Sequence, residues 1–133
     1  MSTTRIRHVH LLVADHERAV AFYTEAFEMV EVLRTGPLVI LTTPGGGDTL
    51  SLHLASTESE HKRVGQQGGY EHFGVYVGER SAGAIDQAVA RVEHAGGRLV
   101  QRGEHAPGVP YAFVADPDGY TVEIQGSPPS AEW

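Results

Sequence analysis

The chain of 133 residues has no cysteine, so disulfides and thiolate ligands are excluded and a metal site has to use His, Asp or Glu. It has no run of about 18 apolar residues that would span a bilayer, and its first residues lack the apolar core of a signal peptide. Positive charge is scarce, with 10 Lys and Arg against 17 Asp and Glu. The formal net charge of −7 argues against nucleic acids or membranes as partners. These features favour a cytoplasmic protein.

Histidine is the prominent residue among those present. Eight histidines occur, and two of them open similar segments, one in each half of the chain. His8 opens His-Val-His-Leu-Leu-Val-Ala-Asp15, and His72 opens His-Phe-Gly-Val-Tyr-Val-Gly-Glu79. Each segment has the alternation of a strand and leads into a helical stretch. The pattern indicates a duplicated unit.

Both halves show the same order of expected elements: strand, helix and three further strands. In the first half, about residues 5–55, the strands are expected at 5–14, 29–34, 38–43 and 49–55 and the helix at 16–28. In the second half, about 70–125, the strands are expected at 70–77, 98–102, 110–115 and 119–125 and the helix at 82–95. A polar linker at 56–69 joins the halves, and residues 126–133 form a tail. The expected fold is one α+β domain of two β-α-β-β-β modules, whose mixed sheet curls into a cup with the helices on its outer face.

Alternation along four of these strands separates an apolar face from a polar one, because successive strand side chains point to opposite sides. The apolar faces suit burial under a helix. The polar faces carry His8, His10, Ser51, His53, His72, Tyr76, Glu123 and Gln125. A concave, partly hydrated face of this kind is where a small-molecule site is expected. The placement of His8, His72 and Glu123 on strands of a duplicated unit predicts a divalent-metal site.

Three segments resemble the vicinal oxygen chelate superfamily: His8–Tyr23, Gly69–Val77 and Phe113–Ile124. That superfamily includes glyoxalase I, fosfomycin-resistance enzymes, extradiol dioxygenases and bleomycin-binding resistance proteins. Together with the order of elements, the resemblance covers nearly the whole chain. It specifies a fold and leaves the reaction open, because one scaffold hosts unrelated chemistries.

The resemblance implies that His8, His72 and Glu123 hold one divalent ion of iron, zinc, nickel or manganese. Glyoxalase I has a further glutamate on its fourth strand, where this chain has Ser51, with His53 two residues on. A His-His-Glu set leaves positions open for two adjacent substrate oxygens, which the ion would polarise as a Lewis acid. With iron(II), dioxygen would take a remaining position.

Further side chains are expected to act around this ion. His10 is the preferred acid/base residue, and Glu123 is expected to be catalytic as well as a ligand. His53, Tyr76 and Gln125 project to the same face, where they would contact substrate or hydrogen-bond the ligands. His105 lies within Gly103–Pro110 and Tyr111 directly follows it. This segment is expected to form a loop over the pocket, and Tyr111 is expected to contact substrate.

Two classes of function follow. The first is a metal-dependent enzyme acting on a small molecule with vicinal oxygens. A glyoxalase-like lyase or isomerase is slightly preferred to an extradiol-type dioxygenase, because short chains are commoner among such lyases. The second is a metal-free protein that binds a bleomycin-type antibiotic or other small ligand, a type that generally lacks the ligand set. The resemblance also implies a homodimer, with the site completed by the partner.

Overall fold

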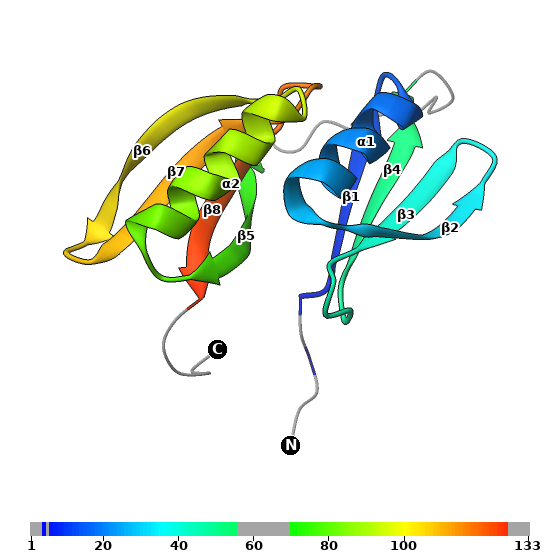
Figure 1. Ribbon diagram of the computed structural model, residues 1–133. Coiled ribbons are helices and arrows are strands. Elements are labelled where there is room, and N and C mark those ends of the chain that lie inside the picture. Colours follow the sequence, from blue (N-terminus) through cyan, green and yellow to red (C-terminus); the bar gives the residue numbers. More distant parts are fainter. Residues whose placement is uncertain (1–3, 5, 56–69, 128–133) are drawn as a thin grey trace.

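The computed structural model describes residues 4, 6–55 and 70–127. Module 1 contains β1 (His8–Val13), α1 (His16–Phe27), β2 (Val30–Thr35), β3 (Leu38–Thr42) and β4 (Thr49–Leu54). Module 2 contains β5 (His72–Glu79), α2 (Ala82–His94), β6 (Arg98–Ala106), β7 (Val109–Ala115) and β8 (Thr121–Ser127). The predicted α+β fold of two β-α-β-β-β modules is confirmed (Figure 1). The predicted linker, 56–69, lies outside the described residues.

Each module builds its own four-stranded mixed sheet. The strand orders are β1-β4-β3-β2 and β5-β8-β7-β6. In both sheets the first strand pairs in parallel with the last, and the other neighbours are antiparallel. The strands β1 and β5 are therefore equivalent edge strands, and β4 and β8 are equivalent neighbours. Neither sheet closes on itself.

The two helices form where capping residues and apolar stripes coincide. The Asp15 carboxylate accepts a hydrogen bond from the Arg18 amide at the start of α1, and the Ser81 hydroxyl accepts one from the Ala84 amide in α2. Each helix buries one apolar stripe: Ala19, Phe22, Tyr23, Ala26 and Phe27 in α1, and Ile85, Ala88, Val89 and Val92 in α2. These spacings of three and four residues are those of a helix with one buried face.

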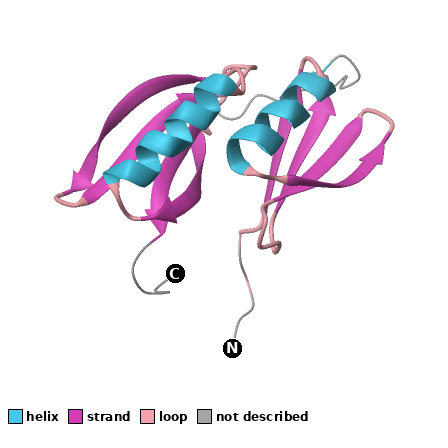
Figure 2. Ribbon diagram, in the orientation of Figure 1, coloured by secondary structure: helices cyan, strands magenta, loops and turns pink. Residues whose placement is uncertain are grey.

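One hydrophobic core spans both modules. The helices α1 and α2 pack against each other as well as against strands of their own modules, and both lie on the same side of the two sheets (Figure 2). The polar faces predicted from the alternation are therefore the faces turned away from the helices. Within the described residues, neither helix is long and apolar enough to cross a membrane.

The turn between β7 and β8, Asp116–Tyr120, fastens module 2 to module 1, and we call it the inter-module latch. Its hydrogen bonds to module 1 are Tyr23 Oη to Asp116 Oδ2 (2.6 Å), Tyr120 Oη to the Leu12 carbonyl (2.7 Å), and the Ala14 amide and Arg18 Nη2 to Asp118 Oδ1 (3.0 and 3.1 Å). Burial, followed by the neighbouring Asp116 carboxylate, raises the pKa of Tyr23 well above its usual value. The latch and the helix contact fix the two modules side by side.

Four strands extend beyond their predicted C-terminal ends: β2 by one residue, β5 and β8 by two, and β6 by four. The strand β8 continues to Ser127, two residues into the predicted tail. The strand β6 continues to Ala106, so Gly103–Pro110 is not a loop over the pocket but a hairpin that turns at Pro107–Gly108. The glycines and prolines of this segment suggested a loop. In the structure, Gly103 is paired with Tyr111 and Pro110 lies within β7.

Candidate functional site

Glu123 is the centre of the polar face of module 2. Its carboxylate comes from β8, with His72 of β5 on one side and His105 of β6 on the other. His72 Nε2 lies 3.1 Å from Oε1, and His105 Nε2 lies 2.6 Å from Oε2. The Gln125 side-chain amide also donates to Oε2. Burial alone would raise the pKa of Glu123, but the hydrogen bonds from His105, Gln125 and His72 together lower it below its usual value.

The His72 ring is held at both nitrogens. Nδ1 faces the Glu71 carboxylate, and Nε2 faces Glu123. The Glu71 hydrogen bond is the larger cause that raises the pKa of His72, and the Glu123 hydrogen bond adds to it against the opposing effect of partial burial. A carboxylate on one imidazole nitrogen, with the other nitrogen turned into a site, is the arrangement that commonly orients metal-binding histidines.

The separation of His72 Nε2 and Glu123 Oε1 suits a shared divalent ion. Two ligands about 2.1 Å from one ion, at angles between tetrahedral and right-angled, lie roughly 3.0–3.4 Å apart, and the observed distance is 3.1 Å. One imidazole and one carboxylate are also the donor types that zinc, iron and manganese accept. Two of the three predicted ligands, His72 and Glu123, are therefore spaced as a shared metal ion requires.

An aromatic wall borders Glu123 on the side of the β6–β7 hairpin. The His105 and Tyr111 rings are stacked, with centroids 4.2 Å apart and planes 15° from parallel. Phe113 meets Tyr111 edge-on at 5.2 Å and His72 at 4.8 Å. Tyr111 lies directly over Gly103, where a Cβ would come within 2.7 Å of the phenol oxygen. The absent side chain of Gly103 thus makes room for the ring.

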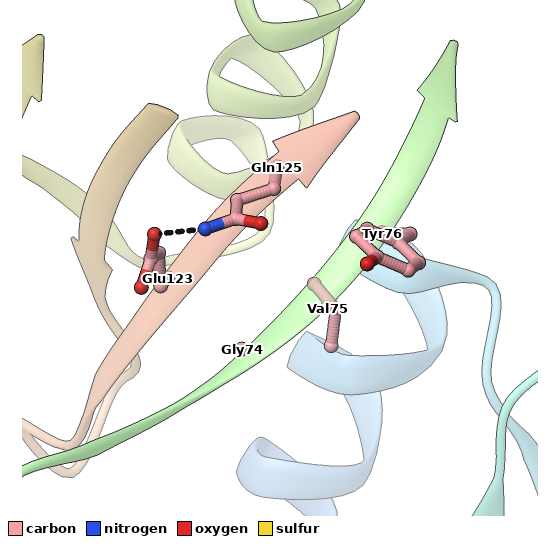
Figure 3. Close-up of a pocket in the computed structure, with 5 residues that line it drawn as sticks. All are labelled: Gly74, Val75, Tyr76, Glu123 and Gln125. Carbon is pink, nitrogen blue, oxygen red and sulfur yellow. Dashed lines mark hydrogen bonds between the residues drawn. The ribbon is translucent and has the colours of Figure 1, made fainter. Parts of the chain in front are cut away.

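A pocket of about 230 Å³ opens beside the carboxylate, lined by Gly74, Val75, Tyr76, Glu123 and Gln125 (Figure 3). Tyr76 is half exposed. Gly74 lies next to Glu123, since a Cβ there would be 3.3 Å from the Glu123 carbonyl oxygen. The predicted ligand Glu123 and the predicted substrate residues Tyr76 and Gln125 thus share one small pocket.

The polar face of module 1 carries a row of histidines around a buried serine. His8 Nδ1 lies 2.5 Å from the Thr49 hydroxyl, while its Nε2 lies 3.3 Å from the Ser51 hydroxyl. His10 Nδ1 lies 2.6 Å from the same Ser51 oxygen, and the rings of His10 and His53 have centroids 5.8 Å apart. Ser51 is only 2% exposed. The predicted residues His8, His10 and His53 are therefore together on one sheet.

Strand register makes His8 and His72 equivalent. In β1 and β4, His8 pairs with Thr49, and the next pair along these strands on the polar face is His10 with Ser51. In β5 and β8, His72 pairs with Thr121, and the next pair on the polar face is Gly74 with Glu123. Ser51 is thus the counterpart of Glu123. In both His8 and His72, Nδ1 contacts a side-chain oxygen. Their Nε2 atoms face Ser51 and Glu123, respectively.

The predicted ligands fall into two half-sites, His8 on module 1 and His72 with Glu123 on module 2. In the part of one chain that the structure describes, no three His, Asp or Glu side chains are grouped to hold a metal ion. His105 does not complete such a group, because it approaches the carboxylate oxygen that His72 does not. A pocket of about 330 Å³ between the β1 and β5 edges is lined by residues of both modules, including His8 and Gly74.

The sequence predicts His105 at a loop over the pocket, but in the structure it lies in strand β6. Its imidazole lies within the polar face and contacts Glu123 directly. Parity along β6 would have indicated this only if the strand had been extended past Gly103 through Gly- and Pro-rich sequence. Two register shifts in the β6–β7 pairing, at Leu99/Gln101 and Glu104/Ala106, further obscure the alternation.

Comparison with known proteins identifies the family. The chain belongs to the Glyoxalase/Bleomycin resistance protein/Dioxygenase superfamily, whose model matches residues 5–124. The resemblance seen in the sequence is therefore confirmed. A search of curated proteins gives no match.

Solved structures share the fold at low sequence identity. A lactoylglutathione lyase from Agrobacterium tumefaciens is 22% identical, with 96% of each chain covered and a TM-score of 0.71. A glyoxylase/bleomycin resistance protein/dioxygenase domain from Frankia sp. EAN1pec is 20% identical, covering 97% of this chain and 96% of that one, with a TM-score of 0.73. The oxidase ChaP-H2 is 19% identical, with 96% of each chain covered and a TM-score of 0.65.

Proposed function

We propose that this protein is a divalent-metal-dependent enzyme that acts on a small molecule with two adjacent oxygens. His8, His72 and Glu123 would hold one ion of iron, zinc, nickel or manganese. The observation that carries the proposal is the equivalence of His8 and His72 in the two sheets. In each ring Nδ1 contacts a side-chain oxygen, and Nε2 faces the equivalent residue of the neighbouring strand, Ser51 or Glu123. A glyoxalase-like lyase or isomerase is the reaction type that we place first.

A homodimer acting in the cytoplasm is part of the proposal. The helix contact and the latch hold the two modules of one chain side by side, with both polar faces turned away from the shared core. Closing the two faces onto each other within one chain would require these contacts to break. A second copy avoids that cost, because His8 of one chain would meet His72 and Glu123 of the other across the interface.

When bound, the ion would supply Lewis-acid polarisation of the two substrate oxygens. The protein side chains would bind and orient the substrate and move its protons. We assign proton transfer to His10, whose Nδ1 faces the Ser51 hydroxyl on the polar face of module 1. His53, Tyr76 and Tyr111 would contact the substrate, with the stacked ring of Tyr111 offering a flat surface.

An extradiol-type dioxygenase is the second candidate, and Ser51 favours it. At the position equivalent to Glu123, module 1 offers a neutral hydroxyl instead of a second carboxylate. The protein would then supply two histidines and one carboxylate, a set typical of iron(II) oxygenases, which need several open positions.

Elemental analysis of protein purified without chelator or added metal tests the proposal. We expect near-stoichiometric metal in the wild type and none in a His8→Ala/His72→Ala double mutant. Zinc, nickel or manganese would support the lyase or isomerase, and iron the dioxygenase. Metal retained by the double mutant would contradict the assigned ligands. Absence of metal in both proteins, with no uptake on reconstitution, would favour the metal-free ligand-binding alternative.

Thermal unfolding gives an independent check. A metal ion that binds only the folded state raises the melting temperature, and the stabilisation grows with the logarithm of the free metal concentration divided by Kd. We expect added metal to raise the melting temperature of the wild type but not that of Glu123→Ala. A rise of equal size in Glu123→Ala would show that the ion binds elsewhere.

A further inference from the structure

The two oxygens of the Glu123 carboxylate have different surroundings. Oε1 faces only His72 Nε2 among the described residues, at 3.1 Å. Oε2 is engaged by two donors, His105 Nε2 at 2.6 Å and the Gln125 side-chain amide. A carboxylate oxygen with two such donors has little remaining capacity for a further ligand, whereas Oε1 retains it.

We propose that His105 and Gln125 are positioning residues that fasten Oε2, so that Glu123 binds the metal through Oε1 alone. The inference rests on the proposed function, in which Glu123 is a ligand. For Gln125 the sequence suggested either a substrate contact or a hydrogen bond to a ligand, and the proposal assigns the second role. The nitrogen of its side-chain amide is directed to the Glu123 carboxylate (Figure 3).

The positioning residues are themselves held in place. His105 is stacked on Tyr111, and the Tyr111 hydroxyl accepts a hydrogen bond from Gln101 Nε2 at 2.9 Å. Gly103 leaves the space in which Tyr111 lies. Gln125 is on the same strand as Glu123, two residues on, so both side chains emerge on the same face. The orientation of the carboxylate is therefore set by the sheet and the hairpin before any ion binds.

Single oxygen binding has a chemical consequence. A carboxylate that uses one oxygen occupies one coordination position, whereas a carboxylate that uses both occupies two. Fastening Oε2 therefore keeps one more position open for substrate oxygens. Partners of metal ligands that act in this way typically contribute about 10–100-fold to metal affinity.

The test is Co²⁺ binding by the full-length protein, measured by competition with a chromophoric chelator at fixed pH. Gln125→Leu and His105→Phe each remove one donor to Oε2, and Phe retains the ring that stacks on Tyr111. We expect each substitution to raise the Kd for Co²⁺ about 10-fold. We also expect the visible absorption of bound Co²⁺ to change in intensity, because a released Oε2 can enter the coordination shell.

Gln87→Leu and His94→Phe are the matched controls, since both residues are exposed on α2, on the opposite side of the sheet. They should retain the wild-type Kd and spectrum. A Kd within twofold of wild type and an unchanged spectrum for Gln125→Leu and His105→Phe, with binding lost in Glu123→Ala, would overturn the positioning role alone. Wild-type affinity in Glu123→Ala, or no Co²⁺ binding by the wild type, would overturn the proposed function as well. If one variant fails to fold, the other carries the same test.

Discussion

The two modules share a scaffold but differ in the charge of their polar faces. In module 2 the position beside the first-strand histidine is Glu123, whose carboxylate oxygens are contacted by His72, His105 and Gln125. In module 1 the equivalent position is Ser51, between two imidazoles. Equal folds thus present a half-site with a carboxylate and a half-site with histidines around a hydroxyl. A duplicated fold retains the backbone positions of a site, while single substitutions decide what those positions can bind.

The helix ends show a second difference between the modules. The residue after α1 that adopts a left-handed conformation is Glu28, with φ of 59°, and the buried Met29 follows it. After α2 the corresponding residues are Gly96, with φ of 102°, and Gly97. Glycine is the residue usually found at such a helix end. Exchanging residues between equivalent positions tests how far each difference matters.

Replacing Glu123 with serine, so that module 2 resembles module 1, should have the largest effect on metal binding. The site loses its only carboxylate ligand, and we expect the affinity for Zn²⁺ to fall by more than about 100-fold, or roughly 2.8 kcal/mol. Competition titration measures the loss. Glu79→Ser, which removes an exposed acid from β5, should leave the affinity unchanged. A loss of less than tenfold in Glu123→Ser would show that the carboxylate is not a ligand.

A side chain at Gly97 is expected to cost stability. A Cβ there would lie 2.6 Å from both the Ala115 carbonyl oxygen and the Phe22 ring, so Gly97→Ala overpacks the core. We expect a loss of about 3 kcal/mol in the free energy of unfolding, measured by urea denaturation. In contrast, Gly83→Ala adds a methyl group to α2 in open space and should be neutral or stabilising. Equal effects of the two substitutions would contradict the packing argument.

Protonation of Glu123 should make the metal-free protein less stable in acid, whereas its counterpart Ser51 does not titrate. The pKa of Glu123 is lowered in the folded state, so its contribution to stability is fully present above the unfolded-state pKa of about 4.3 and is lost as the pH falls through the folded-state pKa. Urea denaturation between pH 3 and 6, in the presence of chelator, would show a steeper acid dependence for wild type than for Glu123→Gln. Ser51→Ala should follow the wild-type dependence. Parallel curves for wild type and Glu123→Gln would contradict the lowered pKa.

The smallest effect is expected at the end of α1. Glu28→Gly relieves a left-handed conformation that disfavours a side chain by about 1–2 kcal/mol, while the flexible glycine loses roughly half of that gain. The net expectation is a stabilisation of about 0.5–1 kcal/mol, seen as a higher urea midpoint. Glu25→Gly, inside the same helix and exposed, should instead cost about 1 kcal/mol. Destabilisation by Glu28→Gly would contradict the strain argument.

Alternation predicted most of the site because it is a local property of the strand. It placed His8 and His10 on one face of β1 and Glu123 and Gln125 on one face of β8, and the structure confirms both placements through their contacts. It failed at His105, where glycines, prolines and two register shifts disguise the end of β6. The sequence also did not predict that the two modules pack side by side through α1 and α2. An apolar stripe on a helix predicts that this face is buried, but it does not predict which element covers the face.

The latch also bears on how the chain is made. Its hydrogen bonds join residues between 93 and 108 positions apart, whereas each sheet pairs within its own module. During synthesis, which proceeds from the N-terminus, module 1 is complete while Asp116–Tyr120 is not yet translated. Until then Tyr23 has no carboxylate partner, and the side of α1 that later meets α2 is uncovered. The nascent first half therefore exposes an apolar helix face that the complete chain buries.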